Sequence, residues 1–486
     1  MQRYLLPFIL LLLPLSLCAQ ATTWVEGRVF HDKNQNKTFD HGEKGLKQIA
    51  VSNGRDIVQT DSKGYFRIAV PAGHSIFPII PTGYTFARHK EEQVNNTFFC
   101  YPEHNATADT TIRQDFGLIA EKQRSTFRIG AIGDIQVGNP EEMNYAGKSI
   151  FRELAGRRDI DFHIILGDLV NDQPDLLPPF RDMLNSLPAP SWTVLGNHDR
   201  NIENTAHLDD RFNKEFGAST YAFSYGGVHF IVLNNVYATG KRSYEGRITD
   251  EQLEFLANDL KTIPTNTPVV ICQHIPMQYT RNRTAVLALV ERFSNVLILS
   301  GHTHQVSRHF YNQGRVQELV TGAPSGNWWT GETDMQGIPE ALMQCGSPRN
   351  YFTVDFDKQN YTLHYKGIGL DKGQQIDMTL RGDTLITNLY GASDSTAVRV
   401  QIDNGEWLPM KQVQRPAESV LRIIENNKEK RFPASGRRIN PLRKRISPHI
   451  WQTVITPLSP GVHEIRIQAA DRFGYAVETI ETLFVP

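Results

Sequence analysis

The sequence predicts a central α/β domain flanked by two small all-β domains. Between residues 126 and 368, apolar stretches with strand character alternate with amphipathic helical patterns, and this alternation is typical of α/β folds. The segments before and after it instead contain short alternating strands separated by Gly and Pro. We therefore expect a leader and three domains, at residues 1–21, 22–122, 123–369 and 370–486.

The central domain is expected to contain both parallel and antiparallel strands. Strands are predicted at 127–133, 161–166, 192–195, 269–272 and 296–299. Helices are predicted at 141–157, 176–187, 250–263 and 285–293, the third beginning after the cap residue Thr249. A hairpin at 221–233, turning at Gly226-Gly227, interrupts the alternation, so we expect mixed sheets.

The flanking domains show the two-residue period of strands. In the first, Trp24–Phe30 and Gly64–Val70 alternate between apolar and polar residues. In the last, residues 397–402 and 462–469 do the same, and Asp403-Asn404-Gly405 predicts a tight turn. We expect both domains to be built from strands.

The first 21 residues have the composition of a secretory signal peptide. Arg3 precedes an apolar run from Leu5 to Leu17, which is too short to span a bilayer comfortably, and small residues follow. Cleavage after Ala19 or Ala21 is expected; acylation of Cys18 is the alternative, although Leu17 is large for the position before a lipidated cysteine. We expect an exported protein, located in the periplasm, on the outer surface or outside the cell. No further transmembrane segment is expected, and the oligomeric state stays open.

The net charge of the chain is close to zero. The sequence carries 51 Lys and Arg against 52 Asp and Glu, for a formal charge of −1. No global field recruits nucleic acid or an acidic membrane, so any anion must be bound by a local site.

Five short polar segments follow predicted strands of the central domain. They are Gly133-Asp134-Ile135-Gln136, Gly167-Asp168, Gly196-Asn197-His198-Asp199, Gln273-His274 and Gly301-His302-Thr303-His304. Each places its side chains at the carboxyl end of a strand, where α/β sheets bind ligands. One such histidine or aspartate is usually structural, but five segments in equivalent positions supply the carboxylate, imidazole and amide groups of a two-metal site. The pattern therefore predicts a catalytic metal centre.

The order and spacing of these segments resemble the calcineurin-like metallophosphoesterases. The resemblance covers about residues 126–368, and the Gly-Asn-His-Asp and Gly-His-Thr-His segments are its most specific signals. It implies a four-layer αββα sandwich and two divalent metal ions, drawn from Mn, Fe, Zn and Mg. It also implies Asp134, Gln136 and His304 as ligands of the first metal and Asn197, His274 and His302 as ligands of the second. Asp168 would bridge the two, and His198 would lie near the scissile phosphate. The flanking β domains resemble those of exported bacterial members.

Two positions depart from the common family pattern. Gln136 stands where histidine is usual, and an amide oxygen favours Mn or Mg over Zn. Asn171 stands where purple acid phosphatases have a metal-binding tyrosine, so the chain should not be one of these; many other members have an aspartate there that holds the catalytic histidine. Either Asp172 or Asp199 could hold His198 here, and the sequence leaves both open.

These residues predict hydrolysis of a small phosphorylated substrate. Two cations lower the pKa of a bridging water, so that hydroxide forms near neutral pH and attacks phosphorus, while His198 protonates the leaving oxygen. A phosphate monoester, a diester and a nucleotide-sugar type pyrophosphate are all compatible with this chemistry. Trp328 and Trp329 could stack on a sugar or base, or could both belong to the core. The alternative function is a surface binding module with a degenerate, inactive site.

The N-terminal domain carries a second metal motif. Six residues occupy positions 1, 3, 5, 7, 9 and 12 of an EF-hand type calcium loop: Asp32, Asn34, Asn36, Thr38, Asp40 and Glu43. The segment after them resembles the start of calcium-binding extracellular B repeats. Lys37 replaces the glycine expected at the sharp turn, at a cost of ~1 kcal/mol. The motif predicts a structural calcium ion, with a polar turn as the alternative.

The stretch from Lys428 to Arg445 is rich in Lys and Arg. A solvated loop is its simplest interpretation. A funnel for anions beside the active site is the alternative.

Overall fold

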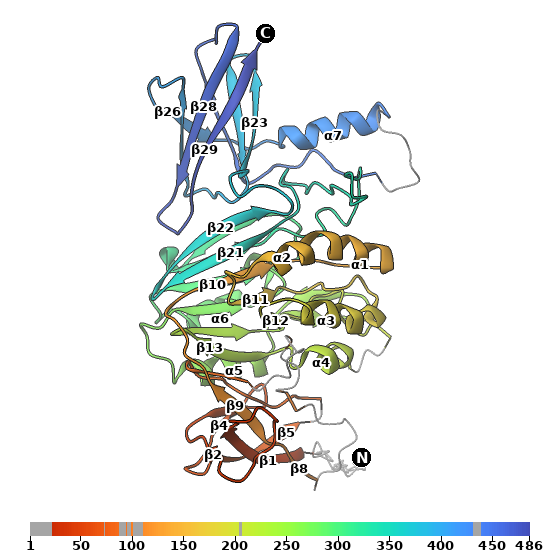
Figure 1. Ribbon diagram of the computed structural model, residues 1–486, viewed down its shortest axis with the longest axis vertical. Coiled ribbons are helices and arrows are strands. Elements are labelled where there is room, and N and C mark those ends of the chain that lie inside the picture. Colours follow the sequence, from red (N-terminus) through yellow and green to blue (C-terminus); the bar gives the residue numbers. More distant parts are fainter. Residues whose placement is uncertain are drawn as a thin grey trace, which may run out of the picture.

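The molecule consists of an α/β body with one β domain at each end of the chain (Figure 1). The computed structural model describes residues 22–486 except 72, 87–93, 95–98, 101–109, 204–206 and 431–438. The expected signal peptide, with Cys18, lies outside the described residues. Among the described residues, no helix is both long and apolar enough to span a membrane.

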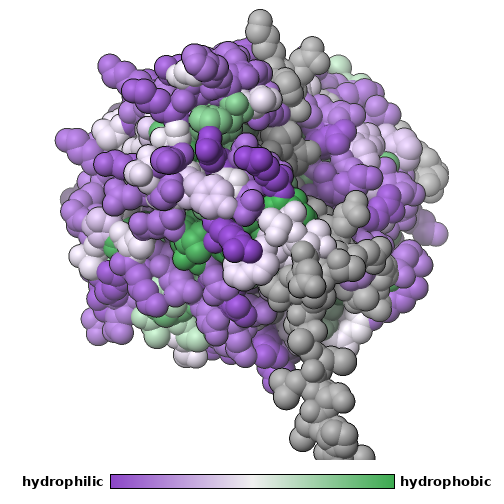
Figure 2. Space-filling view, turned by 90° about the horizontal axis from the view of Figure 1, so that it is seen from below, coloured by the Kyte–Doolittle hydropathy of each residue, from purple (hydrophilic) through white to green (hydrophobic). Residues whose placement is uncertain are grey.

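The N-terminal domain is formed by β1–β9 in two small sheets. Its strands are β1 (Thr22–His31), β2 (Lys44–Gly45), β3 (Ala50–Ser52), β4 (Ile57–Gln59), β5 (Tyr65–Pro71), β6 (Phe77–Pro78), β7 (Tyr84–Phe86), β8 (Thr111–Arg113) and β9 (Phe116–Ala120). The strands predicted at Trp24–Phe30 and Gly64–Val70 form β1 and β5, which pair antiparallel. At this end of the molecule, the visible described surface is mainly hydrophilic, with small hydrophobic areas (Figure 2).

Two mixed sheets form the centre of the body. The first has the order β12-β11-β10-β21-β22 and the second the order β13-β14-β17-β18-β20-β19. The strands of the first sheet are β10 (Thr126–Ile132), β11 (Phe162–Ile165), β12 (Ser191–Thr193), β21 (Asn350–Asp357) and β22 (Asn360–Gly367). Those of the second are β13 (Tyr221–Tyr225), β14 (Val228–Val232), β17 (Val269–Cys272), β18 (Val296–Ser300), β19 (Ser307–Tyr311) and β20 (Val316–Val320). A separate hairpin pairs β15 (Val236–Ala238) with β16 (Tyr244–Gly246). The predicted 221–233 hairpin is thus confirmed as β13 and β14.

Aromatic side chains join the two sheets. Trp192 of β12 stacks on Phe223 of β13 with 3.8 Å between ring centroids, and Phe162 of β11 meets Phe230 of β14 edge to face. Such pairs add specific geometry to the burial of apolar area. They fix the two sheets face to face, which gives the inner two layers of the predicted sandwich.

Helices form the outer layers. They are α1 (Pro140–Ala146), α2 (Arg152–Gly156), α3 (Leu177–Asn185), α4 (Asp210–Phe216), α5 (Asp250–Leu260) and α6 (Arg283–Leu289). α1 and α2 are continuous through a π-helical turn at Gly147–Phe151, so the one helix predicted at 141–157 is present with a bulge. The predicted cap of α5 is confirmed, since the Thr249 hydroxyl accepts a hydrogen bond from the Gln252 amide. The four-layer α/β fold is as predicted.

The C-terminal domain has a seven-stranded sheet in the order β23-β24-β27-β26-β25-β28-β29. Its strands are β23 (Ile376–Arg381), β24 (Thr384–Leu389), β25 (Ala397–Ile402), β26 (Leu408–Gln412), β27 (Ile450–Val454), β28 (Gly461–Ala470) and β29 (Ala476–Val485). Asp403 and Asn404 have positive φ, as the predicted turn requires. The expectation of strands alone was wrong, because α7 (Glu418–Lys428) buries Val420 in an apolar cluster with Ile386 and Ile450.

Candidate metal centre

The seven predicted ligands lie on loops that directly follow strands. Asp134 and Gln136 follow β10, Asp168 follows β11, Asn197 follows β12, His274 follows β17, and His302 and His304 follow β18. β10 pairs parallel with β11, β11 with β12, and β17 with β18, so the loops that follow the strands of each sheet lie at the same end of that sheet. The fold therefore collects side chains that are up to 170 positions apart in the sequence (134 to 304).

Several of these residues adopt a strained backbone. Gln136, Asp168, His302 and His304 all have positive φ, between 46° and 71°, which non-glycine residues rarely adopt. Such conformations cost about 1–3 kcal/mol each and cluster at functional sites. The neighbouring glycines are needed for space: a Cβ atom at Gly301 would lie 2.7 Å from Asp134 Oδ2. The backbone of these loops is therefore held in an unfavourable conformation that positions the predicted ligands.

The backbone fixes which nitrogen of His274 faces the site. Its Nδ1 donates to the Leu166 carbonyl at 2.8 Å, so Nε2 is the nitrogen left to face the site. That Nε2 lies 3.1 Å from Asn197 Oδ1 and 3.3 Å from Asp168 Oδ2. Three possible metal-binding atoms therefore lie close together: one nitrogen of His274 and one oxygen each of Asn197 and Asp168.

His304 is oriented in the same way. Its Nδ1 donates to the Gly326 carbonyl at 2.6 Å, and its Nε2 lies 3.6 Å from Asp134 Oδ1. The Asp134 carboxylate also accepts the His302 backbone amide, at 3.0 Å and 2.9 Å from its two oxygens. Asp134 therefore ties the β10 loop to the β18 loop.

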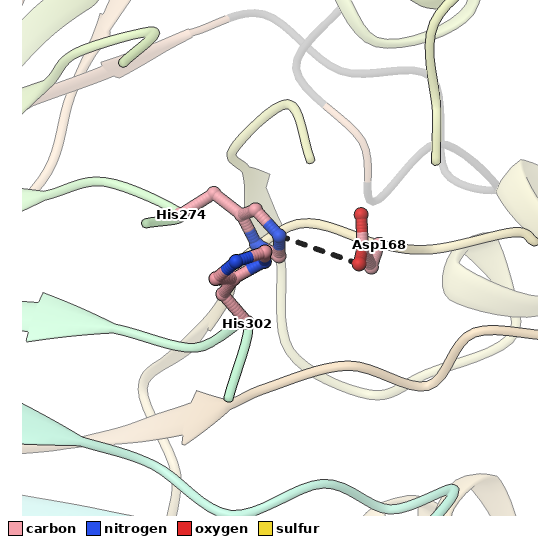
Figure 3. A group of neighbouring side chains, drawn as sticks. All are labelled: Asp168, His274 and His302. Atoms are coloured by element: carbon pink, nitrogen blue, oxygen red, sulfur yellow. Dashed lines mark ion pairs between the residues drawn. The ribbon is translucent and has the colours of Figure 1, made fainter. Parts of the chain in front are cut away.

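Two buried atoms at the site that could bind a metal ion have no hydrogen-bond partner among the described residues. They are Gln136 Oε1 and His302 Nδ1. The ligand atoms of Asp168, His274 and His302 all lie within 4.8 Å of one another, and Figure 3 shows the two imidazoles side by side with the carboxylate opposite. Buried polar atoms are normally satisfied, so oxygen and nitrogen lone pairs left over at such a cluster fit a bound divalent cation. Burial lowers the pKa of His302 to about 3, which keeps this imidazole neutral and able to bind metal.

The remaining charges of the cluster depend on one another. Burial raises the pKa of Asp134, against the opposing effect of His304 and His274. Burial acts in the same direction on Asp168, but the charge and hydrogen bond of His274 hold the pKa of this carboxyl well below its usual range. Burial disfavours protonation of His274, yet Asp168 raises its pKa to about 9. Asp168 is thus the carboxylate that stays ionised at the centre of the group.

Asp172, and not Asp199, holds the predicted catalytic histidine. Asp172 Oδ1 lies 3.0 Å from His198 Nδ1, and Arg242 lies 3.5 Å from the other carboxylate oxygen. Burial opposes protonation of His198, but the hydrogen bond with Asp172 raises its pKa overall. Asp199 instead accepts the backbone amides of Leu169, Val170 and Gly196, which holds the Asp168 loop against the β12 loop. The question that the sequence left open is thereby answered.

Asn171 supports Gln136 and does not reach His198. Gln136 Nε2 donates to Asn171 Oδ1 at 3.4 Å, which directs Gln136 Oε1 away from Asn171. The departure from histidine at position 136 is thus accompanied by an amide partner three residues after Asp168. The two departures from the family pattern belong to one local arrangement.

The two tryptophans have different surroundings. Trp328 is 43% exposed and stacks on the His304 ring at 4.5 Å. Trp329 is only 6% exposed, and its indole N–H donates to the Ile135 carbonyl. The interpretation of Trp329 as a substrate contact was therefore wrong, because this side chain packs beneath the ligand loop; Trp328 alone can meet a ligand.

Sequence reasoning missed two residues beside the centre. The buried Arg200 donates from Nε to the Asn197 carbonyl at 3.0 Å, and its guanidinium lies 5.2 Å from the Tyr244 ring centroid. Tyr244 in turn meets the His302 ring edge to face at 6.0 Å. Arg200 directly follows the Gly-Asn-His-Asp segment, and this position could have indicated that it lies near the site. Tyr244 lies on the β15–β16 hairpin, and nothing in the sequence around it indicated a place near the site.

The predicted calcium loop has the turn that such loops require. Lys37 has a φ of 63° at the position where glycine is usual. The Asp32 carboxylate accepts the amides of Asn36 and Lys37, and Asp40 Oδ2 accepts the side-chain amides of Asn34 and Asn36. Glu43 accepts the amides of Lys33 and Asp40, which closes the loop. Calcium binding by this loop, with Thr38 as its remaining predicted ligand, stays a prediction.

The basic stretch of the C-terminal domain reaches the loop that carries Trp328. Asn440 accepts a hydrogen bond from Asn327 Nδ2 at 2.6 Å and donates to the Leu342 carbonyl. Residues 431–438 of this stretch lie outside the described residues, so its interpretation as an anion funnel stays a prediction.

Three family models match consecutive parts of the chain. The model described as the N terminal of calcineurin-like phosphoesterase matches residues 33–121, the calcineurin-like phosphoesterase model matches 127–306, and the C terminal model matches 318–476. A comparison with curated proteins returns no match.

Three of the similar solved structures come from different organisms. A purple acid phosphatase from yellow lupin seeds is 12% identical over 66% of this chain and 67% of its own, with a TM-score of 0.38. A predicted phosphoesterase from Streptococcus pneumoniae is 13% identical over 50% and 90%, with a TM-score of 0.25. Vps29 of Entamoeba histolytica, solved with zinc, is 12% identical over 49% and 91%, with a TM-score of 0.24.

The fold and the family models define a metal-dependent hydrolase of phosphoester bonds. The chain belongs to the calcineurin-like phosphoesterases, and it carries the N- and C-terminal domains that accompany some of them.

Proposed function

We propose that this chain is an exported phosphoesterase with two metal ions that hydrolyses a small phosphate monoester, diester or nucleotide-sugar type pyrophosphate. The observation that supports it most is the buried cluster in which Gln136 Oε1 and His302 Nδ1 are left without protein partners beside Asp168. In this proposal Asp134, Gln136 and His304 would hold one ion, Asn197, His274 and His302 would hold the other, and Asp168 would be a ligand of both. When bound, the ions supply Lewis acidity that neutralises charge developing on the transferred phosphoryl group.

The chain's own residues orient the donors and the proton. The backbone carbonyls of Leu166 and Gly326 fix His274 and His304, so these ligands need no reorganisation. Asp172 holds Nδ1 of His198, which leaves Nε2 available to give a proton to the leaving oxygen. Because this hydrogen bond raises the pKa of His198, the protonated imidazole is favoured relative to one without this partner.

The side chains around the ligands favour a substrate with a planar or sugar-like group. Trp328 is exposed and stacked on His304, so its free face can receive a ring next to the phosphate. The complete ligand set argues against the alternative of a degenerate binding module. Export is supported by the composition of residues 1–21 alone.

Hydrolysis assays of the purified mature chain test this function. Chromogenic phosphate mono- and diesters and a nucleotide-sugar pyrophosphate are offered with added Mn²⁺, Mg²⁺ or Zn²⁺. Turnover that requires added metal and disappears in Asp168→Asn is expected. Metal binding without turnover on any of the three substrate classes would favour the binding module.

A further inference from the structure

A polar cavity lies between the N-terminal domain and the catalytic body, away from the metal ligands. It has a volume of about 240 Å³. Its residues come from the loops beside β3 and β6 on one side and from the α4 and α5 region on the other: Asn53, Gly54, Gly73, His74, Ser75, Phe77, Asp209, Asn213, Ala218, Ser219, Thr220, Asn234, Thr249, Glu251 and Gln252. Phe77 meets Phe255 of α5 edge to face beside it, and Asn258 donates to the Arg55 carbonyl. We call it the interdomain cavity.

Three buried oxygen atoms of the interdomain cavity residues have no partner among the described residues. They are Ser75 Oγ, Asn213 Oδ1 and Gln252 Oε1. Ser75 and Asn213 are 6% and 8% exposed, so water outside the protein does not satisfy them. The assignment of Gln252 is fixed by its amide, which donates to the Asn234 carbonyl at 2.9 Å and turns Oε1 the other way. Buried acceptors without donors cost free energy unless something positive contacts them.

A carboxylate stands among these oxygens without a cationic partner. Asp209 Oδ2 accepts from Ser219 and from Asn234, both at 2.9 Å, and no ion pair of Asp209 is found in the described part of the chain. Burial raises the pKa of the Asp209 carboxyl, although the hydrogen bonds from Ser219 and Asn234 and the charge of Arg200 act in the opposite direction. Asp209 and Asn213 lie one helical turn apart, since the Asn213 amide donates to the Asp209 carbonyl. Gln252 is linked to Asp209 through Asn234, and Ser75 and Asn213 line the same cavity.

The cavity is lined by the carboxylates Asp209 and Glu251, and His74 is the one basic side chain among the described residues around it. The residues around the cavity include no Lys or Arg, and Glu251 stands beside His74 at 3.7 Å. Carboxylate, amide and hydroxyl oxygens are the ligands of calcium, which tolerates 6–8 of them in irregular geometry and completes its shell with water. A calcium ion contacts 6–8 oxygens at ~2.3–2.6 Å, whereas a buried water makes only about three hydrogen bonds, so one ion can satisfy more acceptors at once than one water.

We propose that the interdomain cavity is a calcium site that fastens the N-terminal domain to the catalytic body through Asp209, Asn213, Gln252 and Ser75. The site is structural and is separate from both the catalytic centre and the predicted loop at residues 32–43. Its affinity should lie in the ~0.1–1 mM range of extracellular calcium modules, because Asp209 is the one carboxylate among the four proposed ligands.

Calcium binding to the full chain tests the proposal. The experiment uses the Asp32→Ala/Glu43→Ala background, which removes the predicted loop site, with excess Mn²⁺ to fill the catalytic centre. Equilibrium dialysis with radioactive calcium should find one ion per chain. Adding Asp209→Asn should weaken binding by about tenfold or more, as loss of the one carboxylate implies. Asn213→Asp, which adds a second carboxylate, should strengthen it by a similar factor, and hydrolysis should be unchanged in both.

Each outcome decides for or against the site. No calcium bound in the background chain would mean that the cavity holds water only, and equal binding with Asp209→Asn would place the ion elsewhere. If Asp209→Asn fails to fold, Asn213→Asp decides the matter, because tighter calcium binding is not expected of a water-filled cavity. Glu254→Gln, on the exposed face of α5 and outside the cavity, serves as the matched control and should bind calcium like the background chain.

Discussion

The catalytic centre and the loop at residues 32–43 are both rich in metal-binding side chains, but they are built in opposite ways. The centre draws its ligands from five loops, and the protein leaves Gln136 Oε1 and His302 Nδ1 unsatisfied. The loop draws its predicted ligands from twelve consecutive residues, whose side chains hydrogen bond to one another and to the loop backbone. The difference teaches that loops held in place by a sheet can leave metal-binding atoms without hydrogen-bond partners. A short loop must instead satisfy its polar groups with hydrogen bonds of its own. Metal should therefore matter to chemistry in the first region and to stability in the second.

The largest expected effect is that of Asp168→Asn. It removes the carboxylate that we propose as a ligand of both ions, so turnover should fall below detection and the metal content should drop. Elemental analysis of the purified variant, with kinetics, checks this. Asp182→Asn on the exposed face of α3 is the control and should change neither quantity. Retention of two ions with activity intact would overturn the assignment of Asp168.

His198→Ala should slow turnover by ~10²-fold or more while the metals stay bound, because it removes a general acid and not a ligand. The loss should be smaller for substrates with good leaving groups, which need no proton. Asp172→Asn should have the same leaving-group dependence with a smaller loss, since His198 remains but loses its anchor. Loss of metal from His198→Ala would show that this residue is a ligand.

Gln136→His should tighten metal binding at the first site several-fold and shift its preference toward Zn, since imidazole replaces an amide oxygen. Competition between Zn²⁺ and Mn²⁺, followed by metal analysis, measures the shift. Asn171→Ala is the companion variant, because it removes the partner that orients Gln136. Unchanged selectivity in Gln136→His would show that residue 136 does not face a metal.

The smallest effect concerns calcium at residues 32–43. Binding only to the folded chain stabilises it by about 2.7 kcal/mol at a hundredfold excess over Kd, and Kd should lie near ~0.1–1 mM. Melting of the full chain in Mn²⁺, with and without millimolar calcium, should show a rise that shrinks in Asp32→Ala/Glu43→Ala. Hydrolysis should be the same in both chains. A calcium response identical in the two chains would reduce the motif to a polar turn.

Much of the fold followed from local pattern, and its gaps have physical causes. The hairpin at β13–β14 and the cap at Thr249 were predictable because turn and cap preferences depend on neighbouring residues. The helix α7 was not, since the amphipathic stretch from Glu418 to Lys428 gains its stability from packing on Ile386 and Ile450, which are remote in sequence.

The sequence by itself predicted the α/β class, and it pointed to seven candidate ligands and to His198, because each of these residues belongs to a short motif that directly follows a predicted strand. Only the tertiary structure decided that Asp172 holds His198 while Asp199 ties two loops together, that Trp328 is exposed while Trp329 is buried, and that Arg200 and Tyr244 border the centre. Only the structure, too, brings Ser75 to Asp209 and Gln252 in the interdomain cavity. The reason is the same in each case: which of two adjacent side chains faces a site depends on backbone direction and on partners remote in sequence, and neither is encoded in local spacing.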